Sequence, residues 1–153
     1  MTTYSPFIAA NKFGLGIQPG EHTEIGKDPK GWLSAQIPLA NRVPPRYSQL
    51  SNSAQLIEMA DADNRQRISF QQDGQVTAEE QQQIRATERL ATALLCTHAN
   101  HRLAVAIESD TPFTERLVRF WSNHFSITLT NNKRTTLYAG LAYENETVRA
   151  NMN

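Results

Sequence analysis

Histidine is the side chain best suited to exchanging protons near neutral pH, and the chain contains four histidines. One of them, His124, stands beside Asn123 and follows Glu115 by nine residues. If these three residues are functional, a hydrolytic enzyme site is the interpretation that suits them, with His124 in the acid–base role. We therefore take His124, Asn123 and Glu115 as the candidate catalytic residues.

A structural role for His124 is the alternative, and it is the interpretation that we favour. His124 follows Phe120 by four residues and Trp121 by three, so on a helix it shares their face. A buried imidazole without a partner would cost about 1–3 kcal/mol. We therefore expect a neutral His124 that is held by one protein acceptor and enclosed by Phe120 and Trp121. A cleft converging on His124 would instead favour the catalytic role.

Metal and thiol chemistry have weaker support. His98 and His101 are three residues apart and could share a helical face as metal ligands, with His124 as a third ligand, but there is no HExxH pattern. We expect instead two polar residues at a junction between helices, with neither metal nor cofactor. Cys96 is the only cysteine, so no internal disulfide can form. Its apolar neighbours indicate a buried, inert side chain.

Two further patterns lack the residues that would make them binding sites. Gly14 and Gly16 have no preceding strand and no following Lys-Ser pair, as a phosphate-binding loop would. The acidic residues Asp61 and Asp63 do not fit the ligand spacing of a calcium-binding loop. Turns and a polar, flexible stretch over 65–74 explain these residues better.

The element that would position the candidate residues is a helix over 113–125. The pair Thr111-Pro112 begins it as an N-cap and a first-turn proline. Its apolar residues recur every three to five positions, namely Phe113, Leu117, Val118, Phe120, Trp121 and Phe125. We predict that this helix is mostly buried against a helix over 78–98. Glu115 and Arg119 would form a solvent-facing pair.

Prolines and capping residues predict the other helices, and the capping box Thr77-Ala78-Glu79-Glu80 begins the helix over 78–98. The expected elements are a helix over 7–13, one over 29–37, one from Ser53 that weakens through 61–64, one over 78–98, a separate piece at 103–107 after a break at Asn100, one over 135–142, and a last turn capped by Asn145. An extended connector is expected over 41–53 because of its adjacent prolines. A short extended segment is expected over 126–130, where polar and β-branched residues alternate.

The bulk composition bounds the function. Lys plus Arg equals Asp plus Glu at 15 each, so the basic excess typical of a nucleic-acid-binding protein is absent. No apolar run is long enough to span a membrane, and no signal peptide is present. We expect a soluble, cytoplasmic protein. The predicted fold class is all-α, an irregular array of helices with the one extended segment, in a single helical region over 1–153.

Three stretches together resemble a known family. They are Ala9-Ala10-Asn11-Lys12-Phe13-Gly14-Leu15-Gly16, the block from Pro112 to Phe125 that contains Phe-Trp-Ser-Asn-His-Phe, and Tyr143-Glu144-Asn145-Glu146-Thr147-Val148-Arg149. They are similar to the start of the bacterial family known as domain of unknown function 1800, in which arginine is usual at the position of Lys12. The resemblance implies that the chain is the N-terminal portion of a larger, helical family domain. The family's activity is not established.

Two functions therefore follow as expectations. The first is a helical scaffold or protein-interaction module, whose partner is another protein or the missing C-terminal half of the family domain. The alternative is a fragment of a hydrolase-like enzyme with a site around Asn123 and His124. We also expect the chain alone to be unstable or to self-associate, because its core is modest and aromatic surface would be left uncovered.

Overall fold

A computed structural model describes residues 5–72, 74–127 and 134–152, and within these ranges every regular element is a helix. The α-helices are α1 (Pro6–Phe13), α2 (Glu21–Lys27), α3 (Pro29–Gln36), α4 (Ser53–Gln72), α5 (Ala78–Glu108), α6 (Pro112–His124) and α7 (Arg134–Tyr143). Shorter 3-10 or π turns are η1 (Ile37–Leu39), η2 (Pro45–Gln49), η3 (Glu144–Val148) and η4 (Arg149–Asn151). The predicted all-α class is confirmed. Of the predicted extended segment, Ser126 and Ile127 lie outside any helix, and 128–130 lie outside the described residues.

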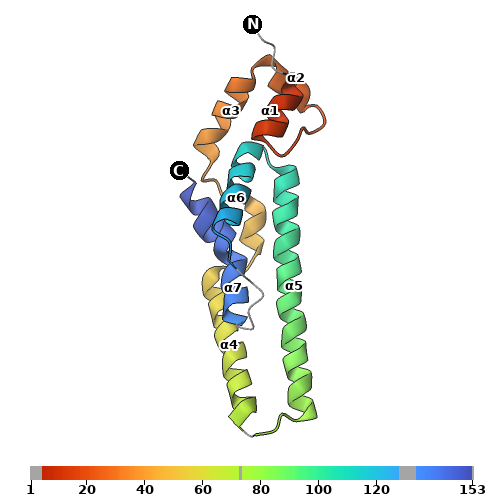
Figure 1. Ribbon diagram of the computed structural model, residues 1–153, viewed down its shortest axis with the longest axis vertical. Helices are drawn as coiled ribbons and strands as arrows, with labels where there is room; N and C mark the ends of the chain where they lie inside the picture. The colour runs from red at the N-terminus through yellow and green to blue at the C-terminus, as the bar shows by residue number, and fades with distance from the viewer. Residues whose placement is uncertain (1–4, 73, 128–133, 153) are drawn as a thin grey trace.

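The two longest helices set the shape of the molecule. Figure 1 shows α4 and α5 running along the long axis and joined at one end, with α1, α2 and α3 gathered at the opposite end. The helices α6 and α7 lie between these parts, and α7 packs along α4. Near the joined end, the Gln66 side-chain amide donates to Gln83 across the pair at 3.0 Å. The arrangement leaves long stretches of helix open to solvent.

The helix α5 begins where the sequence predicted and continues past its predicted end. The Glu80 amide donates to Thr77 Oγ1 at 3.2 Å, and the Thr77 amide donates to the Glu80 carboxylate at 2.7 Å. This reciprocal pair is the predicted capping box. The predicted break at Asn100 is wrong, because α5 is one helix through Glu108. One asparagine lowers helix propensity only slightly, and packing on either side outweighs it.

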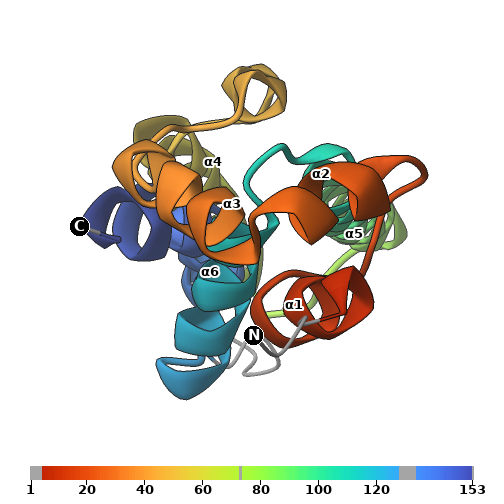
Figure 2. The same cartoon turned by 90° about the horizontal axis from the view of Figure 1, so that it is seen from above.

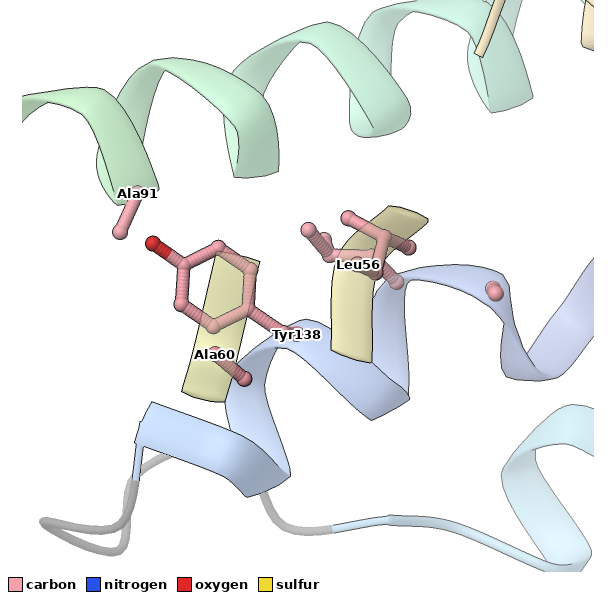
Figure 3. Packing of buried hydrophobic residues seen from close by; sticks show 6 residues of the cluster. Leu56, Ala60, Ala91 and Tyr138 are labelled. Carbon is pink, nitrogen blue, oxygen red and sulfur yellow. The ribbon is translucent and has the colours of Figure 1, made fainter. Parts of the chain in front are cut away.

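The main core lies where α4, α5 and α7 meet. Figure 3 shows the Tyr138 ring of α7 between Ala60 of α4 and Ala91 of α5. The small alanines let the two long helices approach the ring closely. The buried cluster consists of Leu56, Ala60, Ala91, Tyr138, Leu141 and Ala142. Three of these six residues are alanine, so most of the apolar area that holds α7 comes from Leu56, Tyr138 and Leu141.

A second, smaller core joins α1, α2 and α3. Ala9, Ala10 and Ile25 are buried in it, and Trp32 packs against them. The Asp28 carboxylate accepts from the Gly31 amide at 2.9 Å and caps α3. The seven-residue helix α2 was not predicted; it begins after Gly20, which has a positive φ of 91°. Glycine adopts that backbone conformation readily, so it marks a helix start here as well as a turn.

The helix α6 forms as predicted but is not the buried core element that we expected. It begins at Pro112, although the Thr111 side chain caps no amide. Figure 2 shows α6 beside α1 and α3, and its closest packing is with these helices and η3 rather than with α5. Trp121 is 38% exposed, and Phe120 is 57% exposed. The prediction of a mostly buried helix packed on 78–98 is therefore wrong.

Four local predictions are also wrong. Cys96 is exposed, although its sequence neighbours are apolar. The helix α4 continues to Gln72 through the stretch expected to be flexible. Asn145 caps nothing, because α7 passes directly into η3 and η4. In the connector over 41–53, the 3-10 turn η2 replaces part of the expected extended chain. Each error reflects packing that short-range sequence patterns do not encode.

Among the described residues, no helix combines the length and apolar character needed to cross a bilayer.

The core predicts a sharp contrast between neighbouring residues of α4. Leu56 is fully buried, whereas Ile57 is 50% exposed. Leu56→Ala should lower the free energy of unfolding by about 2–5 kcal/mol, because it leaves a cavity beside Tyr138. Ile57→Ala, the matched control, should cost about 0.5 kcal/mol or less. Urea unfolding followed by circular dichroism measures both, and equal losses would contradict the assigned core.

Candidate functional site

A buried ion pair joins α6 to the last described turn of the chain. Arg149 donates from Nη1 to Glu115 Oε1 at 2.6 Å and from Nη2 to Glu115 Oε2 at 2.9 Å. The two side chains are only 1% and 4% exposed. Burial removes the hydration of both charged groups, so the two parallel hydrogen bonds must offset a large free-energy cost of desolvation. This pairing replaces the solvent-facing pair that we predicted between Glu115 and Arg119.

Helix geometry explains why these two residues meet. Glu115 lies in the first turn of α6, and Arg149 opens η4. Between α7 and η4 the chain forms the π turn η3, which inserts an extra residue into the helical turn. This change of register rotates the residues that follow relative to α7. The π turn also packs on α6, which brings Arg149 to Glu115.

A second carboxylate shares the same environment. Glu144 Oε2 lies 2.6 Å from Arg102 Nε of α5, and Glu144 Oε1 lies 3.9 Å from Arg149 Nη2. Ser122 of α6 donates to Glu144 at 3.4 Å. Burial raises the pKa of Glu144 above its ordinary value, and the two guanidinium groups only partly oppose this. Glu144 therefore couples α5, α6 and η4 electrostatically.

An aromatic ring completes the cluster. The Arg149 guanidinium carbon lies 5.2 Å from the centre of the Tyr47 ring, within cation–π range. Burial raises the pKa of Tyr47 to about 12, although the positive charge of Arg149 acts in the opposite direction. Burial also opposes the charge on Arg149, but the hydrogen bonds and charge of Glu115 outweigh it and raise the pKa of Arg149. We call Tyr47, Arg102, Glu115, Glu144 and Arg149 the ionic cluster.

The three candidate catalytic residues do not converge in the structure. Glu115 is occupied by Arg149 at the start of α6. Nine residues separate Glu115 from His124, which corresponds to about 13 Å along a helix. Asn123 lines a cavity between α5 and α6, whereas His124 belongs to the exposed end of the helix. A catalytic role for these residues stays a prediction, and any such site would need groups from elsewhere to bridge that distance.

His124 is exposed within a group of aromatic rings. Its ring centre lies 4.8 Å from that of Phe125, 5.7 Å from that of Trp121 and 6.2 Å from that of Phe120. Trp121 stacks on Phe125 at 5.5 Å. The expectation of an enclosed, buried His124 is wrong, because the His124 side chain is exposed and contacts these rings at the surface of the protein. We call Phe120, Trp121, His124 and Phe125 the aromatic end of α6.

His98 and His101 do not point to a common metal-binding position. His98 Nδ1 lies 3.2 Å from the carbonyl oxygen of Leu141, and His101 Nδ1 lies 3.2 Å from that of Arg46. The two rings thus hold different elements, α7 and η2, against α5. Within the described ranges, no three side chains of the metal-binding types gather closely enough to hold an ion.

Arg116, which was not among the predicted site residues, ties α6 to α1. Its Nη1 donates to the carbonyl oxygens of Gly14 at 2.7 Å and Asn11 at 3.0 Å. These carbonyls are among those left without partners at the end of a helix. A Cβ on Gly14 would lie 3.3 Å from Pro112 Cβ and 2.8 Å from the Ala10 carbonyl oxygen, so only glycine fits there. The sequence shows an arginine next to Glu115, but residue spacing within one helix could not predict its partners, which lie more than 100 residues away.

Arg149 and Glu144 were also missed as partners of Glu115. Both lie in the stretch from Tyr143 to Arg149 that carried the family resemblance. That stretch, the segment around Gly14, and α6 are in contact through Arg116 and the Glu115–Arg149 pair. The three similar stretches therefore form one connected unit in the structure.

The chain matches a protein-family model. Residues 8–153 match the sequence model of a family described as protein of unknown function (DUF1800). No curated protein matches the chain. No solved structure matches it either.

The ionic cluster predicts a large penalty when one charge is removed. Glu115→Ala should lower the free energy of unfolding by about 3–5 kcal/mol, because it leaves the Arg149 charge buried without its partner. Glu108→Ala removes an exposed bidentate pair with Arg46 and should cost about 1 kcal/mol or less. The double change Glu115→Leu with Arg149→Met should cost less than Glu115→Ala alone. Urea unfolding tests all three, and equal costs for the two alanine variants would refute the assignment.

His98 predicts a dependence of stability on pH. Burial lowers its pKa below the ordinary value of 6.5, so the folded protein takes up a proton less readily than the unfolded chain. Its contribution to stability should be present above pH 6.5 and should decline as the pH falls through that value. Thermal melts between about pH 8 and pH 5 should show a smaller decline for His98→Gln than for the wild type. His101→Gln is the control that leaves His98 in place, and identical profiles for His98→Gln and the wild type would contradict this.

Proposed function

The chain belongs to the DUF1800 family, and from this premise we propose that it is a helical protein-interaction module. The aromatic end of α6 would form the centre of its contact face. The observation that carries the proposal is the exposure of these rings, with Phe120 at 57% and Phe125 at 55%. Aromatic residues are enriched at the centres of protein interfaces, where they bury a large area at a small cost in conformational entropy.

The extent of the surface supports the same proposal. The accessible surface is 10225 Å². A compact monomer of 17.2 kDa would expose about 7,800 Å², so the chain has roughly 2,400 Å² more. Permanent interfaces bury about 2,000–5,000 Å² in total, and each partner contributes half. A partner covering the excess would thus make an interface of the permanent class.

The exposed apolar side chains and the balanced charge favour a polypeptide with an apolar surface as the partner over nucleic acid. The exposed large apolar side chains include Phe7, Phe13, Leu103, Ile107, Phe120, Trp121, Phe125 and Ile127. The equal numbers of acidic and basic residues provide no net field to attract nucleic acid. An apolar helical face would match such side chains. Following the family resemblance, we propose the C-terminal half of the family domain as this partner.

Paired association measurements test the proposal. The chain would be mixed with the C-terminal half of a longer family member and followed by sedimentation velocity. We expect a one-to-one complex. Phe120→Ser combined with Phe125→Ser should raise its Kd at least about tenfold, because two central rings are removed from the interface. Alone, the wild-type chain should associate with itself as its concentration rises, and this double variant should do so less.

The control removes apolar surface elsewhere on the long helices. Ile68 of α4 and Leu90 of α5 are 47% and 49% exposed, so Ile68→Ser with Leu90→Ser matches the first variant in the number of large apolar side chains removed. It should leave the Kd within about twofold of the wild type, as expected for residues outside an interface centre. Absence of any complex, or an equal loss in both double variants, would overturn the proposal. A monomeric wild-type chain with a sharp, cooperative melt would also count against it.

A further inference from the structure

A cavity of about 480 Å³ lies between α5 and α6, and α7 and η3 also line it. Leu95 and Leu141 supply part of its apolar lining, and Arg119 and Asn123 of α6 line it from the other side. Its volume falls in the range of about 300–1,000 Å³ that is usual for small-molecule sites. It is separate from the rings of the aromatic end, none of which lines it.

Three residues of the lining carry buried polar atoms without a hydrogen-bond partner. The atoms are His98 Nε2, Asn145 Oδ1 and the hydroxyl oxygen of Tyr47, which can donate as well as accept. His98 as a whole is only 8% exposed. Buried polar atoms in proteins nearly always have a partner, so three such atoms in the lining of one cavity indicate that it accommodates a polar molecule.

The hydrogen bond on the other side of the His98 ring determines what that molecule must offer. His98 Nδ1 lies 3.2 Å from the Leu141 carbonyl oxygen, which can only accept, so Nδ1 carries the proton. Burial favours the neutral ring by lowering the pKa of His98. The opposite nitrogen, Nε2, is then an acceptor, and so is Asn145 Oδ1. A ligand that meets both atoms must donate hydrogen bonds.

The charges and lone pairs around the cavity disfavour both cationic and anionic ligands. The Glu144 carboxylate in the lining is already paired with Arg102 at 2.6 Å, and Arg119 adds a further positive charge. An ammonium group would therefore face the positive charge of Arg119 and a carboxylate whose charge Arg102 already neutralises. An anion would face the lone pairs of His98 and Asn145. Hydroxyl groups avoid both conflicts, since they donate to these two acceptors and can accept from the arginines.

We propose that this cavity binds a neutral, hydroxyl-rich small molecule of the monosaccharide or cyclic-polyol class. Hydroxyl groups of the ligand donate to His98 Nε2 and Asn145 Oδ1. Leu95 and Leu141 contact its apolar C–H groups. The site does not depend on the proposed protein-interaction face, so either could fail without the other.

Saturation-transfer difference NMR and calorimetry on the 153-residue chain test the binding. The probes are glucose, galactose and myo-inositol, and fully O-methylated glucose is the control that cannot donate. At least one underivatised probe should bind with one-to-one stoichiometry, whereas the methylated sugar should not. Inorganic phosphate and ethylamine test the excluded charge classes.

Three variants locate the binding. Ala99 is exposed on α5 and lines the cavity, so Ala99→Trp should obstruct it without disturbing the core. Ala86 is an exposed alanine of the same helix outside the cavity, and Ala86→Trp is the matched control. His98→Leu removes the Nε2 acceptor. We expect the Kd to rise at least about tenfold in Ala99→Trp and His98→Leu, and to stay within about twofold of the wild type in Ala86→Trp.

The outcomes are decisive in both directions. Binding of an underivatised probe that Ala99→Trp abolishes and Ala86→Trp preserves supports the proposal even if His98→Leu does not fold. The proposal is overturned if none of the three hydroxyl-bearing probes binds, or if Ala99→Trp leaves binding intact. Equal binding of O-methylated glucose, or preferential binding of phosphate or ethylamine, would overturn it as well.

Discussion

The fold depends on an ion pair that has been taken out of water. Glu115 and Arg149 are almost fully buried, so neither charge is stable unless the other is in place. The two residues lie 34 positions apart, and Arg149 also lies over the ring of Tyr47. This requirement fixes the position of α6 relative to the end of the chain. Packing between apolar side chains alone would permit many more relative positions.

Neighbouring contacts extend this constraint through the molecule. Arg116 binds the carbonyls at the end of α1, and Gly14 makes room for Pro112 at the start of α6. Through Glu144, the same cluster reaches α5 at Arg102. The helix α6 is thus anchored by polar contacts over its first half. Its second half carries the aromatic end, whose rings are exposed. That division of one helix into an anchored half and an exposed half underlies the interaction that we propose.

Local signals in the sequence were enough to place most helices, because capping boxes and first-turn prolines act within a few residues. The capping box at Thr77, the helix after Pro29 and the all-α class were predicted correctly. Glu115 was identified as a candidate residue, but the spacing rule offered Arg119 as its partner, since it considers only residues one helical turn away. The exposure of Trp121 was missed for a related reason. An apolar helical face indicates that something covers it, and the sequence does not specify whether the cover is the same chain or another molecule.

The most direct test of the central role of the ion pair is amide hydrogen exchange in Glu115→Gln. This change keeps the shape of the side chain and removes the charge that Arg149 requires. If the pair fixes α6 to the end of the chain, the amides of α6, η3 and η4 should lose protection together, by at least about tenfold, while those of α4 around Leu56 keep theirs. Unchanged protection in α6 and η3, or a uniform loss across all helices, would contradict the account.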